Sequence, residues 1–403
     1  MIATISPGPL RGIVRAPSSK SAAHRALICA ALSDGPTQLH LTGLNEDISA
    51  TIACLTALGA RIDWEGERGQ LSVRPAGRSH MPAAAPLDLH CGESGSTLRF
   101  LLPLACALGA KARFTGCGRL PERPNAALVR ALRAHGAAID SDLLPMNVSG
   151  SLSGGRWELP GNVSSQYITG LMFALPLLRE DSEIRLTAPL ASAAYVDMTL
   201  GMLDRFGIAV EPTASGWLLP GRQSYRSPGA LTVEGDWSAA AFWFAADALG
   251  SHISVEGLSP DSAQGDRAAT ELLGQRTIDA TNVPDLVPAL AAAAAVLPQR
   301  TVITGAARLR LKESDRLEAV SKMIASMGGR AEVTADGLIL QGCPQPHGGV
   351  VNGYSDHRIV MAAAILATRA DGPVTITGAE AVNKSYPDFF RDFAKLGGRV
   401  HVE

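Results

Sequence analysis

The 403-residue sequence has few aromatic residues, little net charge and no long apolar run, and each shortage excludes a class of protein. Aromatic residues make up 5% of the chain, too few for a surface that stacks nucleic-acid bases. The 36 basic and 38 acidic residues give a formal charge of −2, without the basic excess of a nucleic-acid-binding protein. The longest apolar runs, such as Leu286 to Leu297, are shorter than the about 20 residues of a membrane span. We therefore expect a soluble protein with neither a nucleic-acid nor a membrane partner.

Cysteine is also scarce, and its placement argues against disulfides and metal. The cysteines form no CxxC pair, and no histidines stand at the spacing of metal ligands. We expect buried, reduced thiols, as in a cytoplasmic protein, and no metal site. The N-terminus has no basic segment followed by an apolar stretch and a cleavage site, so no secretory signal is expected. The six positions are Cys29, Cys54, Cys91, Cys106, Cys117 and Cys343.

The sequence is rich in an internal repeat. One helical segment recurs and ends in an apolar residue, a glycine and a strand-like stretch, as in TIACLTALGARID and FFRDFAKLGGRVHV. Glycine is the expected residue just after a helix, because it adopts the left-handed conformation without a Cβ clash. A degenerate further copy ends near Gly274. The other marker glycines are Gly59, Gly136, Gly207, Gly328 and Gly397.

A second, more apolar helix recurs at a similar interval of about 70 residues. Its apolar character nearly all round predicts burial on most faces, whereas the first helix has a charged side and should lie outside. The copies start at Lys20, Ser94, Ser164, Ser238, Asp285 and Asp356. The sequence thus predicts an α/β protein of about six repeated units, three to a half, with the halves joined near residues 233–237. Whether the first strand returns to complete the second half cannot be decided from periodicity.

Cations stand near many of these helix starts, where acidic and hydroxyl residues are normally preferred. Local rules are broken mostly at functional sites, and cations beside unpaired backbone N–H groups form strong anion sites. Any single one could be an ordinary ion pair or a solvated side chain, so the recurrence carries the signal. The cations are Lys20, Arg25, Arg99, Arg123, Lys312, Arg316, His357, Arg358 and Lys384.

Hydroxyl, small and acidic residues accompany the cations. Ser164 and Ser165 open a helix and could bind phosphate, although an ordinary N-cap explains them equally well. Gly95 would let a ligand approach the backbone, or would simply make a turn. Asp285 and Glu313 are the acid–base candidates. The plain alternatives are an N-cap for Asp285 and a first-turn acid that complements the helix dipole for Glu313.

Seven segments, in order along essentially the whole chain, together resemble the enolpyruvylshikimate phosphate synthase (3-phosphoshikimate 1-carboxyvinyltransferase) family. They are PSSKSAAHR, CGESGSTLRF, LPERP, PGNVSSQY, RLRLKESDR, YSDHRIVM and NKSYPDFF. The resemblance implies two lobes, each an inside-out α/β barrel of three repeats, with the active site in the cleft between them. It places residues 16–236 in the N-terminal lobe and residues 1–15 plus 237–403 in the C-terminal lobe.

The resemblance also implies the reaction. The enolpyruvyl group of phosphoenolpyruvate would pass to the 5-hydroxyl of shikimate 3-phosphate, releasing phosphate, in the shikimate pathway to chorismate and aromatic amino acids. It implies no cofactor, no metal and a monomer. The alternatives are transfer to UDP-N-acetylglucosamine by the sister enzyme, which uses a loop cysteine comparable to Cys117, and an inactive ligand-binding paralogue.

By resemblance, roles pass to individual positions of this sequence. Asp285 is the base beside the 5-hydroxyl, Glu313 protonates the phosphoenolpyruvate methylene, and Lys20 lies near both substrates. The residues implied for shikimate 3-phosphate are Lys20, Ser21, Arg25, Ser164, Ser165, Gln166, Ser192, Asp285 and Lys312. Those implied for phosphoenolpyruvate are Lys20, Gly95, Arg123, Gln166, Arg316, Arg358 and Lys384.

Some positions depart from common family patterns. Glu93 and Arg308 stand where asparagine is frequent, and Ala193 and Ala194 follow Ser192 where a basic residue and proline are often found. Glu93 would add negative charge near the phosphoenolpyruvate site. The departures therefore put substrate affinity in doubt, but not the reaction class.

Overall fold

The computed structural model describes residues 1–75 and 86–403. This part of the chain divides into two compact units, each with a hydrophobic core of its own. The N-terminal unit is Lys20–Val233, and the C-terminal unit combines Met1–Ser19 with Glu234–Glu403. The boundaries that the sequence predicts, at residues 16 and 236, lie within a few residues of these.

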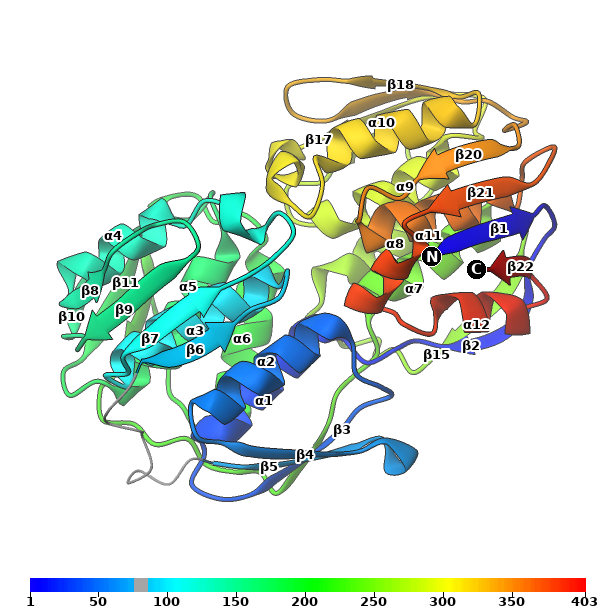
Figure 1. Ribbon diagram of the computed structural model, residues 1–403. Helices are drawn as coiled ribbons and strands as arrows, with labels where there is room; N and C mark the ends of the chain where they lie inside the picture. The colour runs from blue at the N-terminus through cyan, green and yellow to red at the C-terminus, as the bar shows by residue number, and fades with distance from the viewer. Residues whose placement is uncertain (76–85) are drawn as a thin grey trace. The chain divides into compact units, whose positions relative to one another are not determined.

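The apolar helices of the repeat form the interior of each unit, as predicted. Their faces are buried almost all round, and every residue of the last one is buried. They are α1 (Lys20–Leu32), α3 (Gly95–Ala107), α5 (Ser165–Ala174), α7 (Trp237–Ala248), α9 (Val287–Ala294) and α11 (His357–Ala367). In the C-terminal unit α7, α9 and α11 pack against one another (Figure 1). In the N-terminal unit α3 packs closely on α5. The helices approach so closely at Gly170 that a Cβ there would lie 2.1 Å from the carbonyl oxygen of Arg99.

The second set of helices is only partly buried and has charged outer faces. They are α2 (Glu46–Ala57), α4 (Ala126–Ala134), α6 (Ala193–Arg205), α8 (Ala269–Leu272), α10 (Arg316–Ser326) and α12 (Phe389–Lys395). A glycine follows each of these helices two residues after its last residue, with a φ angle between 72° and 103°. A glycine with positive φ at this position closes the last helical turn. The four-residue α8 belongs to the copy that the sequence analysis marks as degenerate, and the positive-φ Gly274 follows it at a distance of two residues.

The four-stranded sheets of both units share one pattern. Two parallel strands come first, followed by two strands added antiparallel. In the N-terminal unit the sheets are β14 (Ala230–Thr232)–β3 (Thr37–His40)–β5 (Gln70–Arg74)–β4 (Arg61–Glu65), β6 (Leu87–His90)–β7 (Ala112–Thr115)–β9 (Met146–Gly150)–β8 (Ala137–Ile139), and β10 (Gly155–Pro160)–β11 (Ser182–Ala188)–β13 (Gly216–Leu219)–β12 (Glu211–Thr213). In the C-terminal unit they are β16 (Thr277–Asp279)–β17 (Arg300–Thr304)–β19 (Leu338–Gln341)–β18 (Arg330–Val333), β20 (Gly349–Asn352)–β21 (Val374–Thr377)–β1 (Ile2–Ser6)–β22 (Arg399–Val402), and the pair β15 (His252–Glu256)–β2 (Arg11–Arg15).

The chain's first strands complete the C-terminal unit. β1 lies between β21 and β22 and pairs antiparallel with both, so the two termini lie in the same sheet (Figure 1). β2 pairs parallel with β15. The predicted α/β architecture of repeats, three per lobe, is therefore confirmed, and β1 fills the place that an internal strand holds in the other four-stranded sheets.

Candidate active site

The most concentrated group of charges in the C-terminal unit surrounds Arg316, the first residue of α10. Its side chain is 1% exposed, and it donates to Asp285 Oδ1 at 2.8 Å and to Glu313 Oε2 at 2.6 Å. Its Nε donates to Asp356 Oδ2 at 2.8 Å. Burial alone would lower the pKa of Arg316, but the carboxylates of Asp356, Glu313 and Asp285 outweigh it and raise the pKa above its usual value. Arg316 therefore holds both candidate acid–base residues at once.

Asp285 is the point where further cations meet. Lys312 Nζ lies 3.4 Å from Asp285 Oδ1, and Arg358 Nη2 lies 3.3 Å from Asp285 Oδ2. Arg358 Nη1 also donates to the Asp285 carbonyl at 3.0 Å. Asp285 lies in the 3-10 helix η5 (Pro284–Leu286), directly before α9. Positive groups from α10, α11 and the Lys312 loop are thus gathered on one carboxylate, where an anionic substrate would compete for them.

The segment before α11 has an unusual backbone. Tyr354 and Ser355 adopt positive φ angles of 52° and 51° although neither is glycine. Consecutive left-handed residues of this kind carry strain, which is found mainly at functional sites. The Ser355 carbonyl accepts a 2.6 Å hydrogen bond from Lys384 Nζ, at the end of η7 (Ala379–Lys384). The strained turn therefore fixes the position of this buried lysine.

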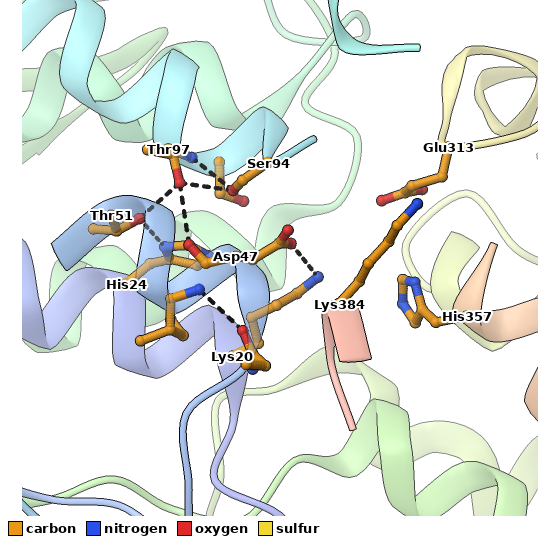
Figure 2. A network of polar contacts seen from close by, with 12 residues as sticks. Lys20, His24, Asp47, Thr51, Ser94, Thr97, Glu313, His357 and Lys384 are labelled. Atoms are coloured by element: carbon orange, nitrogen blue, oxygen red, sulfur yellow. Dashed lines mark hydrogen bonds and ion pairs between the residues drawn. The ribbon is translucent and has the colours of Figure 1, made fainter. Parts of the chain in front are cut away.

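In the N-terminal unit, Lys20 begins α1 as predicted and pairs with an acid on the next helix. Lys20 Nζ lies 2.7 Å from Asp47 Oδ2, and both side chains are mostly buried (Figure 2). Asp47 lies in the first turn of α2, where a negative charge also complements the helix dipole.

Gly95 and Arg123 lie against each other. A Cβ on Gly95 would lie 2.9 Å from either terminal nitrogen of Arg123, so a larger residue here would require this guanidinium to shift. Arg123 is 6% exposed, and its Nε has no hydrogen-bond partner within residues 1–75 and 86–403. A buried, unpaired cationic donor is costly unless a ligand satisfies it. Arg123 is therefore the clearest sign of an anion site in this unit.

The start of α5 is connected to α3 through one amide. Gln166 accepts from Arg99 Nη1 at 2.7 Å and donates to Ser96 Oγ at 3.0 Å. Ser164 is the N-cap of α5, its hydroxyl accepting from the Gln166 N–H at 3.3 Å, and Ser165 is the first helical residue. The capping interpretation of Ser164 is thus correct, which leaves its phosphate role a prediction.

Two further predicted binders have markedly buried side chains. Arg25 is 2% exposed and donates to Thr199 Oγ1, the Ser21 carbonyl and the Tyr195 carbonyl. Burial lowers the pKa of Arg25 to about 10. Ser192 is the N-cap residue of α6 and has a positive φ of 58°, another strained non-glycine position.

Comparison with known proteins decides the family. The family model described as EPSP synthase (3-phosphoshikimate 1-carboxyvinyltransferase) matches residues 5–393. The chain belongs to this family. It is 41% identical to the 3-phosphoshikimate 1-carboxyvinyltransferase of Clostridium kluyveri, covering 98% of this chain and 97% of that one. It is 39% identical to that of Clostridium perfringens, covering 99% of each. A solved EPSP synthase structure from Acinetobacter baumannii aligns over all of both chains with a TM-score of 0.81 at 26% identity.

Membership in the EPSP synthase family confirms the resemblance, the fold and the reaction class of the sequence analysis. The reaction of this family is enolpyruvyl transfer from phosphoenolpyruvate to shikimate 3-phosphate, in the shikimate pathway. No helix within residues 1–75 and 86–403 is both long enough and apolar enough to cross a membrane. The roles of individual site residues stay predictions.

The structure corrects several local expectations. Asp285 is not an N-cap, since Val283 holds that place and the Asp285 side chain turns to Arg316. Glu313 precedes α10 and is not in its first turn, because Asp315 is the N-cap. α7 and α9 start at Trp237 and Val287 rather than at Ser238 and Asp285.

The buried-thiol expectation fails for two cysteines: Cys117 is exposed and Cys343 is partly exposed. The others are buried, and burial raises the pKa of the Cys106 thiol to about 12.

Sequence reasoning missed three acidic residues of these clusters. Asp356 marks a helix start in the sequence, yet its buried carboxylate also holds Arg316 and Ser314. Asp47 gave no signal beyond an ordinary first-turn acid. Asp266 is 5% exposed, and burial, then the Asp285 carboxylate, raise its pKa to about 7 against the opposing effect of Arg358. In the sequence, Asp266 lies in the glycine-containing segment AQGDR, and nothing in that segment indicates a buried carboxylate close to Asp285.

The structure gives the surroundings of the residues that depart from the family pattern. The Glu93 carboxyl group lies against Gly118, where an added Cβ would come within 2.3 Å of it. Arg308 Nη2 donates to the Thr281 carbonyl at 2.6 Å, in the loop between β16 and η5. Arg308 therefore supports the segment that leads to Asp285. Ala193 and Ala194 are the first residues of α6, next to the strained Ser192.

Proposed function

We propose that this chain transfers the enolpyruvyl group of phosphoenolpyruvate to the 5-hydroxyl of shikimate 3-phosphate, with Asp285 as base, Glu313 as acid and Lys20 close to both substrates. The residues proposed for shikimate 3-phosphate are Lys20, Ser21, Arg25, Ser164, Ser165, Gln166, Ser192, Asp285 and Lys312. Those proposed for phosphoenolpyruvate are Lys20, Gly95, Arg123, Gln166, Arg316, Arg358 and Lys384. We further propose a cytoplasmic monomer, which light scattering would test.

The observation that carries this proposal is the buried Arg316 with its carboxylates. One guanidinium holds Asp285 and Glu313 together, at 2.8 Å and 2.6 Å. The chemistry requires both residue types: an acid that protonates the methylene carbon of phosphoenolpyruvate and a base that takes the proton of the attacking hydroxyl. A common anchor positions the two groups relative to each other, which is the part of catalysis that a rigid protein supplies best.

The same ion pair suggests how the acid is prepared. A guanidinium favours the charged form of a carboxylate beside it, and Arg316 Nη2 lies 2.6 Å from Glu313 Oε2. The carboxylate of phosphoenolpyruvate has the charge and shape to take the place of Glu313 on Arg316. Binding of phosphoenolpyruvate would thus change the charges around Glu313, the proposed acid.

The bond changes balance without a cofactor. Protonation of the methylene carbon leaves positive charge on the adjacent carbon, and the hydroxyl oxygen attacks that carbon as Asp285 takes its proton. The tetrahedral adduct returns a methyl proton to Glu313 as its bond to phosphate breaks, which restores the double bond. The proton held by Asp285 leaves with the inorganic phosphate. Cations around the developing and departing charges supply electrostatic stabilisation.

Phosphate release from phosphoenolpyruvate, measured separately with shikimate 3-phosphate and with UDP-N-acetylglucosamine, tests the proposal. We expect release with the shikimate ester alone. Asp285→Asn and Glu313→Gln should each lower kcat by at least about 100-fold. The matched control Glu332→Gln, which changes an exposed glutamate on β18 of the same unit, should leave kcat unchanged.

Two results would contradict the proposal. Release with the nucleotide sugar alone would assign the chain to the sister reaction. Tight binding of both proposed substrates without any release would indicate a ligand-binding paralogue.

A further inference from the structure

A buried chain of hydrogen bonds connects the helices α1, α2 and α3 of the N-terminal unit (Figure 2). His24 Nδ1 lies 2.8 Å from Thr51 Oγ1, and Thr51 Oγ1 lies 2.7 Å from Thr97 Oγ1. Thr97 Oγ1 lies 2.7 Å from Ser94 Oγ. His24, Thr51 and Thr97 are fully buried, and Ser94 is 1% exposed. The members of the chain come from three helices that are separate in the sequence.

Each member of this chain is one step away from a residue of the candidate site. His24 follows Lys20 by one helical turn on α1, and Thr51 follows Asp47 by one turn on α2. Ser94 is the N-cap of α3 and directly precedes Gly95. Thr97 Oγ1 also lies 3.4 Å from the Asp47 carbonyl. The chain therefore joins, from the protein interior, the helix starts that carry Lys20 and Gly95.

The chain of hydrogen bonds carries no charge, and its hydrogen bonds run in one direction. Burial, then the charges of Lys20 and Arg25, hold the pKa of His24 well below its usual value, so the ring has one N–H. Each hydroxyl has one hydrogen to donate, and the Thr97 hydroxyl donates to Ser94 Oγ, so the hydrogen bonds run from His24 toward Ser94. In this direction the Oγ atoms of Thr51 and Thr97 each accept one hydrogen bond and donate one. A buried, satisfied polar network of this kind fixes one arrangement of the surrounding helices.

An apolar interior would pack these helices without the cost of burying polar groups. His24 Nε2 has no hydrogen-bond partner within the described residues, which shows that this cost is not fully recovered. A contribution to stability alone therefore does not explain this chain of hydrogen bonds. A need to hold the starts of α1 and α3, which carry Lys20 and Gly95, in an accurate register does explain it.

We propose that His24, Thr51 and Thr97 are positioning residues that hold the Ser94–Gly95 start of α3 in register with Lys20, and so set the affinity for phosphoenolpyruvate. The inference rests on the proposed function, since Gly95 and Lys20 are assigned there to phosphoenolpyruvate. None of the three residues is proposed to touch a substrate.

The test breaks one link without changing the volume of the side chain. Thr97→Val removes the hydroxyl, Thr97→Ser retains it, and Thr51→Val breaks the chain at the next link. Thr301→Val is the matched control, because Thr301 is fully buried on β17 and its Oγ1 has no hydrogen-bond partner among the described residues. The measurements are KM for phosphoenolpyruvate, the Kd of shikimate 3-phosphate alone, and hydrogen exchange at the amides of residues 95–98.

We expect Thr97→Val and Thr51→Val to raise KM for phosphoenolpyruvate by about five- to tenfold, the effect of one lost buried hydrogen bond. The Kd of shikimate 3-phosphate should change by less than about twofold, while exchange at residues 95–98 should accelerate about as much as KM rises. Thr97→Ser should restore both values, and Thr301→Val should change neither.

A KM within about twofold of wild type together with unchanged exchange would overturn the proposal. So would an equal loss in kcat and in the affinity for both substrates, which is the pattern of general destabilisation. If the unaltered protein does not consume phosphoenolpyruvate at all, the proposed function fails, and hydrogen exchange still decides whether the chain orders the start of α3.

Discussion

Replacing Asp356 tests the physical basis of the Arg316 cluster most sharply. The Asp356 carboxylate is fully buried, accepts from Arg316 Nε at 2.8 Å and caps α11 through the Arg358 N–H at 3.0 Å. Asp356→Asn keeps the shape and the capping oxygen but removes the charge. Breaking a buried ion pair costs about 3–5 kcal/mol, and Arg316 retains Asp285 and Glu313 here. We therefore expect a loss of about 2–3 kcal/mol in the free energy of unfolding.

Asp356→Ala should cost about 1 kcal/mol more than the asparagine variant, because it also removes the cap. Calorimetric unfolding is the assay, and the asparagine variant should lower Tm by roughly 4–12 °C for a unit of this size. The matched control is Asp388→Asn, since Asp388 forms an exposed ion pair with Arg391 at 2.6 Å and should matter by less than about 1 kcal/mol. An asparagine variant as stable as this control would refute the buried-cluster account. An alanine variant as stable as the asparagine variant would show that the Asp356 cap does not contribute to the free energy of unfolding.

Three further outcomes are expected. Gly95→Ala should raise KM for phosphoenolpyruvate about tenfold in steady-state kinetics, because its Cβ displaces the buried Arg123 guanidinium; an unchanged KM would separate Arg123 from this substrate. The pKa of Asp266 is raised to about 7, so its contribution to stability falls as pH rises from about 4 to 7, by at most about 4 kcal/mol, and levels off above that range. Asp266→Asn should flatten this part of a stability–pH curve, and an unaltered slope would contradict it. Cys117→Ser should keep kcat within about twofold, because the thiol is exposed and has no role in the proposed chemistry; a severe loss would instead indicate the sister reaction.

The architecture was largely predictable because the repeat is a local pattern. A glycine such as Gly59 or Gly328 adopts positive φ at a helix end for reasons contained in a few neighbouring residues. Burial of the apolar helices follows equally directly from their composition. The place of β1 between β21 and β22 could not be predicted from the sequence, since it depends on pairing between opposite ends of the chain. No periodicity within a repeat carries that information.

The candidate site was predictable in its cations but not in the acids that pair with them. Cations at helix starts break a local preference and therefore stand out in the sequence. Asp356 and Asp47 obey that preference, so they look like ordinary capping or first-turn acids, and only the folded chain brings Asp356 to Arg316, 40 residues away. Asp285 and Glu313 show the reverse error, because the N-cap interpretation of Asp285 and the first-turn interpretation of Glu313 are wrong. Both side chains turn to the same arginine.

Identifying what becomes of the acceptor molecule tests the central claim most directly. Mass spectrometry and NMR of shikimate 3-phosphate, after incubation with phosphoenolpyruvate and this protein, would show whether a new carbon–oxygen bond has formed. The account predicts an enolpyruvyl ether at the 5-oxygen and one inorganic phosphate released for each acceptor converted. Unchanged shikimate 3-phosphate beside pyruvate and phosphate would show hydrolysis instead of transfer, and would contradict the roles given to Asp285 and Glu313.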